Sequence, residues 1–381
     1  MKKKIGILTQ PLSTNYGGLI QAFALQKFLM KRGYEVQVIN RVFKPVSIFR
    51  FVLSLFKTYL SYFLMGSKIE LRKISDWKSK KELKLIAKNT EKFIKDNIIV
   101  TEIFKKKINK KLIRKYNFDG YVVGSDQVWR PMYSPYLPNY FFDFLNENDE
   151  VKRVSYAASF GVDFWEFNNK QTNTCKHLVK QFEAVSVRED SGVDLCKQYF
   201  GIDAVHLLDP TMLLDNEDYE DLVKNCSIAK NMPPFLTTYF LDEDIDKIEI
   251  AENVAASLKF QLMSNIYSKT EISESTPKPP VEEWLERFMK ASFVVTDSFH
   301  GTVFSIIFNI PFIVIANKKR GISRFTSLLS KFNLEDRLVF NDNKQITENI
   351  FNHIDWKKVN EIRELEKLKS IDFIEKSFDF K

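Results

Sequence analysis

Cysteine is scarce in this sequence, and the few cysteines form no recognisable pattern. Cys175, Cys196 and Cys226 are odd in number and include no Cys-x-x-Cys pair. Such a set builds no disulfide framework, and the four scattered histidines supply no zinc-ligand spacing beside it. The sequence therefore predicts a protein of a reducing compartment with no bound metal.

Long apolar runs are also lacking. The start, MKKKIGILTQ, enters a strand-like run without a secretory signal, and no stretch of about 18 uncharged apolar residues follows. We therefore expect a cytoplasmic protein. The segment 48–65 is densely apolar, although Arg50 and Lys57 interrupt it. It predicts either a helix packed on the domain or on another subunit, or an interfacial helix that rests on anionic lipid at the inner face of the membrane.

Glycine is rare as well, with 12 copies against 34 phenylalanines, so each glycine in a turn is informative. The net charge of +8 indicates anionic partners. Much of this charge lies in a lysine-rich belt from Lys68 to Lys115, for which a set of solvated helix faces is the alternative interpretation. No nucleic-acid motif accompanies the belt, so we do not expect nucleic-acid binding.

Strand-like runs alternate with helical segments along the chain. This order predicts an α/β fold with two Rossmann-like domains that face a cleft, each built on a parallel sheet. In residues 1–222, expected strands open the segments 4–9, 34–40, 120–129, 153–161, 184–192 and 205–211, and a basic helical insertion occupies about 42–115. In residues 223–381 they open 235–241, 260–264, 293–296 and 311–315, and a helical tail from Trp356 crosses back to the first domain.

Ligands of such sheets gather at the carboxyl ends of the strands, so the loops there hold the candidate site residues. In STNYGG (13–18), Asn15, Gly17 and Gly18 open a helix whose free N–H groups favour anions or sugar hydroxyls. The spacing matches neither a dinucleotide fingerprint nor a P-loop. A plain turn is the alternative interpretation.

Polar residues follow two further strands of the first half. In VVGSDQVW (122–129), Ser125, Asp126 and Gln127 are candidates for binding sugar hydroxyls, and Asp126 for accepting protons; an Asx turn or helix cap is the alternative. In SVREDSG (186–192), the planar fork of Arg188 suits a carboxylate or phosphate. There the alternative is a surface pair with Glu189.

Two loops of the second half add further candidates. TDSFHG (296–301) carries Asp297, Ser298 and His300, and a histidine can exchange protons near neutral pH or donate to an anion. A structural histidine is the alternative. KKRGISRF (318–325) joins cations to the start of a helix, which predicts an anion site or else a solvated basic loop; its candidate residues are Arg320, Ser323 and Arg324.

Taken in order, these blocks resemble the polysaccharide pyruvyl transferase family. The blocks that carry the resemblance are TNYGGLIQAFAL (14–25), VVGSDQVWRP (122–131), SYAASFG (155–161), SVRED (186–190), LDPT (208–211) and VEEWLERFMKASFVVTDSFHGTVFSIIFNIPF (281–312). The resemblance implies a GT-B-like fold, with an acceptor side in the first half and a donor side in the second. It also implies transfer of a pyruvyl group from phosphoenolpyruvate to paired hydroxyls of a sugar in a cell-surface polysaccharide or its lipid-linked precursor.

The resemblance links Arg188 and His300 to binding and conversion of phosphoenolpyruvate. Better-studied members often have arginine two residues before the histidine, where this chain has Ser298. A different cation must then hold the donor phosphate here, and Arg324 and Arg320 are the candidates. The reaction forms a ketal, releases phosphate and needs no cofactor beyond phosphoenolpyruvate as co-substrate.

Pyruvyl transfer requires an acid that protonates the methylene carbon and a base that activates the sugar hydroxyl. His300 is expected to serve one role, and Asp126 or Asp297 the other. Two other classes of function remain open: a GT-B glycosyltransferase that uses a nucleotide sugar, and a non-catalytic carbohydrate-binding protein of the same fold.

Overall fold

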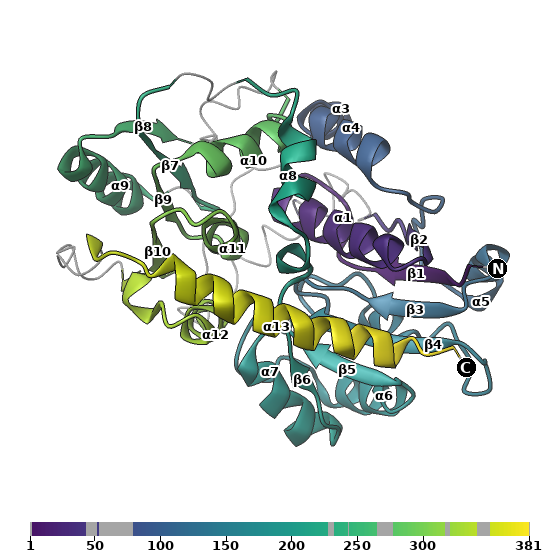
Figure 1. The fold of residues 1–381 in the computed structure, drawn as a ribbon. Coiled ribbons are helices and arrows are strands. Elements are labelled where there is room, and N and C mark those ends of the chain that lie inside the picture. Colours follow the sequence, from purple (N-terminus) through teal and green to yellow (C-terminus); the bar gives the residue numbers. More distant parts are fainter. Residues whose placement is uncertain are drawn as a thin grey trace.

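Two parallel sheets divide the chain between them. A computed structural model describes residues 2–42, 52, 79–227, 232–242, 244–264, 277–316, 321–340 and 351–380. The first sheet has the strand order β2-β1-β3-β4-β5-β6 and the second has the order β11-β10-β9-β7-β8. Neighbouring strands are parallel throughout both sheets (Figure 1). The predicted fold class, with two parallel α/β halves, is confirmed.

The inner strands of the first sheet are apolar runs buried on both faces, as expected for parallel strands covered by helices, whereas its two edge strands are partly exposed. Its strands are β1 (Lys4–Leu8), β2 (Glu35–Val38), β3 (Gly120–Val123), β4 (Lys152–Ala158), β5 (Ala184–Val187) and β6 (Val205–His206). The helices of this half are α1 (Tyr16–Lys31), α3 (Lys80–Ile86), α4 (Lys88–Asn97), α5 (Lys110–Ile113), α6 (Asn169–Val179), α7 (Asp190–Leu195) and α8 (Asn216–Val223).

The second sheet restarts the same alternation of strands and helices. Its strands are β7 (Phe235–Tyr239), β8 (Gln261–Ser264), β9 (Phe293–Thr296), β10 (Phe312–Ala316) and β11 (Leu338–Phe340). Its helices are α9 (Ile245–Leu258), α10 (Val281–Lys290), α11 (Phe299–Ile307), α12 (Ser323–Lys331) and α13 (Trp356–Ser377). The sequence did not indicate β11, because a run of three residues is too short to show a period of two.

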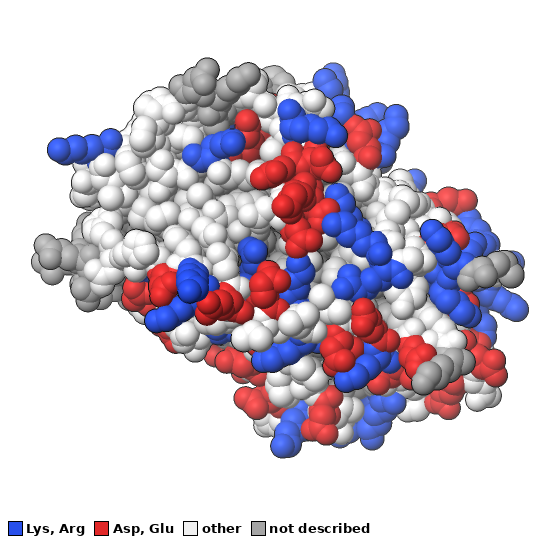
Figure 2. All heavy atoms as spheres, viewed as in Figure 1, with Lys and Arg blue, Asp and Glu red and all other residues white. Residues whose placement is uncertain are grey.

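The C-terminal helix α13 returns to the first half, as predicted, and runs across the front of both halves in Figure 1. Near its end, the ring of Phe373 lies 6.4 Å from that of Tyr156 in β4, between centroids. The following Phe378 packs against Gly120, where an added Cβ would lie 2.9 Å from the ring. Along the exposed side of α13, acidic and basic side chains alternate (Figure 2), which favours a solvated surface.

The two halves also share one apolar core. A single cluster of buried side chains includes residues of β1, α1, α10 and α11. Tyr16 of α1 lies 5.4 Å from Trp284 of α10 and 6.4 Å from Tyr239 of β7, between ring centroids. The site loops of the halves are thus held against each other by packed aromatic side chains.

The connection between the sheets runs from His206 to Phe235 and includes α8. The boundary proposed at residue 222 falls in this connection, at the end of α8. The described part of the basic insertion contains the helices α3, α4 and α5, and residues 98–109 between α4 and α5 are not helical. Apart from Val52, the apolar segment 48–65 lies outside the described residues. Among the helices that the structure describes, none is long and apolar enough to cross a membrane.

Candidate active site

Several of the predicted site residues follow the carboxyl ends of parallel strands and meet where the two halves touch. Ser125 and Asp126 follow β3, Arg188 follows β5, and His300 lies in the first turn of α11 after β9. Asp209, which follows β6, joins them. All five residues are buried, so little of the cluster is exposed to bulk water.

Asp209 lies at the centre of this cluster. Its Oδ2 accepts hydrogen bonds from Ser125 Oγ at 2.8 Å and from Arg188 Nη1 at 3.0 Å. Its Oδ1 accepts from the backbone N–H and the hydroxyl of Thr211, at 3.0 and 2.8 Å. Burial raises the pKa of this carboxyl, but the His300 ring, the Arg188 charge and the Thr211 N–H together hold the pKa below its usual range. Asp209 is therefore a carboxylate at neutral pH.

His300 projects from the second half into the first. Its Nε2 lies 3.7 Å from Asp209 Oδ2 and has no hydrogen-bond partner among the described residues. On the other side, the ring is pressed against Gly17, where an added Cβ would lie 2.2 Å from Nδ1. Ser298 caps α11, accepting a 3.4 Å hydrogen bond from Gly301 N. The ring is thus fixed between α1 and the central carboxylate.

Asp126 has a backbone conformation that few non-glycine residues adopt. Its φ of +76° lies in the left-handed region, which costs energy for a residue with a Cβ. Its Oδ1 accepts from Gln127 N at 2.8 Å and lies 4.0 Å from Arg188 Nη2. Its Oδ2 would lie 3.4 Å from a Cβ added to Gly18. The strained turn therefore places a carboxylate at the opening of α1, between Gly18 and Arg188.

Two buried arginines approach the cluster from different halves. The Arg188 guanidinium lies 4.1 Å, and that of Arg324 5.9 Å, from the centroid of the Phe299 ring. Burial lowers the pKa of Arg324 to about 10, with a further contribution from the positive charge of Arg188. Nε and Nη2 of Arg188 have no hydrogen-bond partner among the described residues. Guanidinium N–H groups that are buried and unpaired suit an anionic ligand.

The loops that surround the cluster are fixed by a second carboxylate. Glu189 Oε1 accepts hydrogen bonds from Ser159 Oγ, Phe160 N and Gly161 N at 2.7–3.0 Å. The alternative of a surface Arg188–Glu189 pair is therefore wrong, because both side chains are buried and have other partners. Gln127 Oε1 accepts from Arg130 Nη1 at 3.0 Å.

A backbone contact joins the loops of the two halves. Gly321, which has a φ of +85°, lies so close to Gly161 that an added Cβ would be 2.0 Å from its carbonyl oxygen. Ser323 follows as the first residue of α12, and Ile322 precedes it at the N-cap position without a side-chain cap. The Ser323 hydroxyl is buried and has no hydrogen-bond partner among the described residues.

Some predicted residues do not join this cluster. The Asp297 carboxylate is bound by Lys247 Nζ at 2.6 Å and by Leu241 N at 2.7 Å, both within the second half. Asn15 caps α1, with Oδ1 accepting from Gly18 N at 3.3 Å, so its side chain serves the start of the helix. Arg320 lies outside the described residues.

Sequence reasoning missed two residues with a place in this region. Asp209 stands in the quoted LDPT block, but an aspartate before proline at a strand end is also a common turn residue. Lys278 carries no motif at all. Its Nζ donates to Thr14 O at 2.7 Å and lies 4.2 Å from the centroid of the Tyr16 ring, and burial lowers its pKa to about 8. It adds a cation beside the opening of α1.

Metal ligation has no candidate in the part of the chain that the structure describes, where no group of three or more histidine, cysteine, aspartate or glutamate side chains could hold an ion. The chemistry that these residues can perform is anion binding by arginine and proton transfer by histidine and carboxylate.

The fold and the site define a two-half α/β protein with a buried arginine–histidine–carboxylate cluster between parallel sheets. The sequence pattern described as Polysaccharide pyruvyl transferase matches residues 15–319. The chain therefore belongs to the polysaccharide pyruvyl transferase family, a family of transferases. No significant match to a curated protein sequence was found.

Solved structures that superpose on the chain have very different sequences. A candidate UDP-N-acetylglucosamine 2-epimerase from Listeria monocytogenes superposes with a TM-score of 0.51 at 11% identity, covering 99% of this chain and 91% of that one. The S. aureus MnaA–UDP structure gives 0.49 at 13% identity, with 98% and 96% covered. A glycosyltransferase from Rickettsia africae gives 0.45 at 11% identity, with 98% and 94% covered. At these identities the likeness is one of fold alone.

Proposed function

We propose that the protein transfers a pyruvyl group from phosphoenolpyruvate to two hydroxyls of one sugar residue, forming a cyclic ketal and releasing phosphate. The observation that carries the proposal is the buried meeting of Arg188, Arg324 and His300 at the contact of the halves, in a chain of this family. Phosphoenolpyruvate is small and carries a carboxylate and a phosphate, so it needs several cations in a small volume. It serves as co-substrate, and the proposal includes no other cofactor.

The charges around the cluster set the donor's orientation. Arg188 is partly neutralised by Asp209, whereas its Nε and Nη2 remain available to a ligand. Arg324 approaches the same Phe299 ring. It takes the place of the arginine that better-studied members of the family have at the position of Ser298. Asp126 and Asp209 lie nearby, and their negative charge favours a ligand whose anionic groups face the arginines rather than the carboxylates. In this arrangement Arg188 and Arg324 bind the carboxylate and phosphate of the donor.

The reaction then needs two proton transfers. A first hydroxyl oxygen of the sugar bonds to C2 of phosphoenolpyruvate while C3 gains a proton and becomes a methyl group. A second hydroxyl oxygen then replaces phosphate at C2, which closes the ketal. The proton lost by the first hydroxyl is matched by the proton that C3 gains, and the proton of the second hydroxyl leaves with phosphate. We assign the acid role to His300, oriented by Asp209, and the base role to Asp126 at the opening of α1.

The acceptor belongs to a polysaccharide or its precursor, by the description of the family. A cytoplasmic location belongs to the proposal, since the donor is a cytoplasmic metabolite. Contact of 48–65 with a membrane likewise stays a proposal, as does the role of Asp297, whose observed partners favour a structural function.

The test is a turnover assay with phosphoenolpyruvate and a panel of oligosaccharides, read by phosphate release and by the mass of the sugar product. The proposal predicts acceptor-dependent phosphate release and a product heavier by one pyruvyl ketal. The competing function, glycosyl transfer on the same fold, predicts instead a product heavier by one sugar when nucleotide sugars are supplied.

A further inference from the structure

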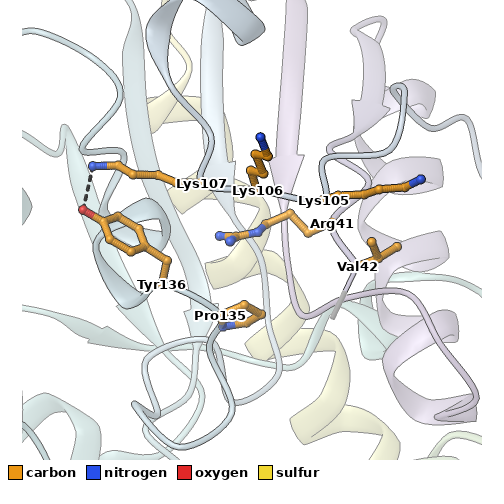
Figure 3. A pocket seen from close by; sticks show the side chains of 7 residues that line it. All are labelled: Arg41, Val42, Lys105, Lys106, Lys107, Pro135 and Tyr136. Carbon is orange, nitrogen blue, oxygen red and sulfur yellow. Dashed lines mark hydrogen bonds between the residues drawn. The ribbon is translucent and has the colours of Figure 1, made fainter. Parts of the chain in front are cut away.

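A basic cavity lies on the first half, apart from the cluster just described. Its volume is about 470 Å³, and the residues that line it come from the chain after β2, from the lysine belt and from the loop after β3. They are Arg41, Val42, Lys105, Lys106, Lys107, Pro135 and Tyr136 (Figure 3). Because β2 and β3 are parallel strands of one sheet, the cavity opens at the same edge of that sheet as the active-site cluster.

Arg41 forms the fixed part of the cavity. It is only 4% exposed, and its Nη1 donates to Asn139 Oδ1 at 3.1 Å. Asn139 is itself buried and bonds both the N–H and the carbonyl of Ile108. Nε of Arg41 has no hydrogen-bond partner among the described residues. Figure 3 shows the guanidinium extending toward the space beside Pro135 and Tyr136. A buried arginine held in this way is a built site for an anion.

The three lysines add charge that is only slightly compensated. Lys107 Nζ donates to the Tyr136 hydroxyl at 2.6 Å and lies 2.9 Å from Asp143 Oδ2. Lys105 and Lys106 are exposed and have no carboxylate partner among the described residues. Arg41 and the lysines thus provide four positive charges, and among the described residues they form an ion pair with one carboxylate, that of Asp143. A net charge of this size attracts a multivalent anion more strongly than a single carboxylate.

A hydrogen-bonded side chain connects the cavity to the cluster. Gln10 Nε2 donates to Ser134 Oγ at 3.0 Å and to Gln127 O at 2.7 Å. Ser134 directly precedes the cavity residues Pro135 and Tyr136, and Gln127 directly follows Asp126. The loop that lines the cavity is thus hydrogen-bonded, through Gln10, to the loop that carries Asp126.

We propose that this cavity binds the phosphate groups of a phosphorylated sugar acceptor and so positions the sugar for the cluster. The identity of the ligand as the sugar acceptor rests on the proposed function, whereas the binding of phosphate is argued from the cavity alone. The phosphate belongs either to the acceptor itself or to lipid head groups. The cations of the cavity would bind a phosphate from either source in the same way. Four clustered cations suit a phosphate or diphosphate, and Lys acts on such groups as a mobile point charge.

Calorimetric titration of inorganic diphosphate into the full chain tests this site without requiring turnover. The double variant Lys105→Gln/Lys106→Gln should weaken diphosphate binding by about tenfold or more, because two of the four cations are lost. Lys80→Gln/Lys81→Gln is the matched control, since these two lysines are also exposed neighbours in the basic belt of the first half. It should leave the affinity within about twofold.

The variant Arg188→Lys distinguishes diphosphate binding in this cavity from diphosphate binding in the donor cluster. Diphosphate binding that falls with Arg188→Lys but not with Lys105→Gln/Lys106→Gln would place the anion in the cluster and overturn the proposal. Diphosphate that does not bind at all would also overturn it. A third outcome is that the wild type does not turn over phosphoenolpyruvate, while diphosphate binding is weakened only in the Lys105→Gln/Lys106→Gln variant. This outcome would refute the proposed function but support the phosphate site.

Sedimentation with vesicles identifies the source of the phosphate. Vesicles of phosphatidylcholine with and without phosphatidylglycerol are compared for the wild type and the Lys105→Gln/Lys106→Gln variant. Loss of binding to the anionic vesicles in this variant would assign the cavity to lipid head groups. Equal vesicle binding by both proteins, together with weaker diphosphate binding by the variant, would assign it to the acceptor.

Discussion

At the scale of single residues, His300 has surroundings that a purely structural histidine would not need. Its Nε2 is buried without a hydrogen-bond partner among the described residues, although the Asp209 carboxylate lies 3.7 Å away. A buried polar atom left unpaired costs about 1–3 kcal/mol, and a ligand that hydrogen-bonds to it would recover that cost. The free nitrogen is available to a ligand that enters between Arg188 and Arg324.

The first prediction concerns this ring. His300→Asn should lower kcat by about 100-fold or more and leave the fold intact, because general acid–base catalysis typically contributes that factor. The matched control is His177→Asn on α6, where the histidine is exposed and pairs with Glu147. Near wild-type turnover by a folded His300→Asn protein would mean that the histidine is structural.

Lys278 gives a prediction about pH. Burial lowers its pKa from 10.5 to about 8, so between these values the folded chain binds fewer protons than the unfolded chain. The free energy of unfolding contributed by this group therefore rises with pH across that window and is lowest below about pH 8. Compared with Lys278→Met, the wild type should gain melting temperature between neutral pH and about pH 10. An identical difference in melting temperature at both pH values would contradict the shifted pKa.

At the scale of elements, the turns between strands and helices carry the site, and this could be predicted from the sequence. Parallel strands end at one edge, so STNYGG, VVGSDQVW and SVREDSG had to approach one another once the first sheet formed, whereas TDSFHG follows a strand of the second sheet and meets them only through the contact of the halves. What could not be predicted were side-chain partners that depend on packing between elements. Asp297 looked equivalent to Asp126 in sequence, yet its carboxylate forms an ion pair with Lys247 of α9. Asp209 looked like a turn residue, yet it became the centre of the cluster.

The close approach of α1 and α11 yields the next prediction. In Gly17→Ala, the new Cβ would lie 2.2 Å from His300 Nδ1, so the imidazole must move. A displaced catalytic group costs about 100-fold in rate, and turnover should fall by that order. Gly18→Ala is the matched control, because its Cβ would approach Asp126 Oδ2 only to 3.4 Å.

Both glycines lie in the same helix, so the backbone effect of alanine on α1 is shared by the two variants. Circular dichroism and melting temperature monitor that shared effect, and steady-state kinetics monitors the ring. Equal activities of the two variants would show that the contact between Gly17 and His300 has no functional role.

At the scale of the whole molecule, the two halves were predictable and their contact was not. The repeated order of strands and helices indicated two parallel sheets, and the structure contains them. The sequence did not show that Tyr16, Tyr239 and Trp284 pack into one core across the halves. Nor did it show that Gly161 and Gly321 meet backbone to backbone. These contacts close the cluster, so we expect ligand entry to require a movement of the halves or of the loops between them.

The most direct test of the account is calorimetric titration of the donor. Phosphoenolpyruvate should bind the wild type, whereas UDP-N-acetylglucosamine should not. Arg188→Lys should weaken phosphoenolpyruvate binding by about tenfold or more, because lysine keeps the charge beside Asp209 but lacks the planar fork. Arg114→Lys, at an exposed arginine, is the control and should bind as the wild type does. Binding of the nucleotide sugar without binding of phosphoenolpyruvate would contradict the account and favour glycosyl transfer.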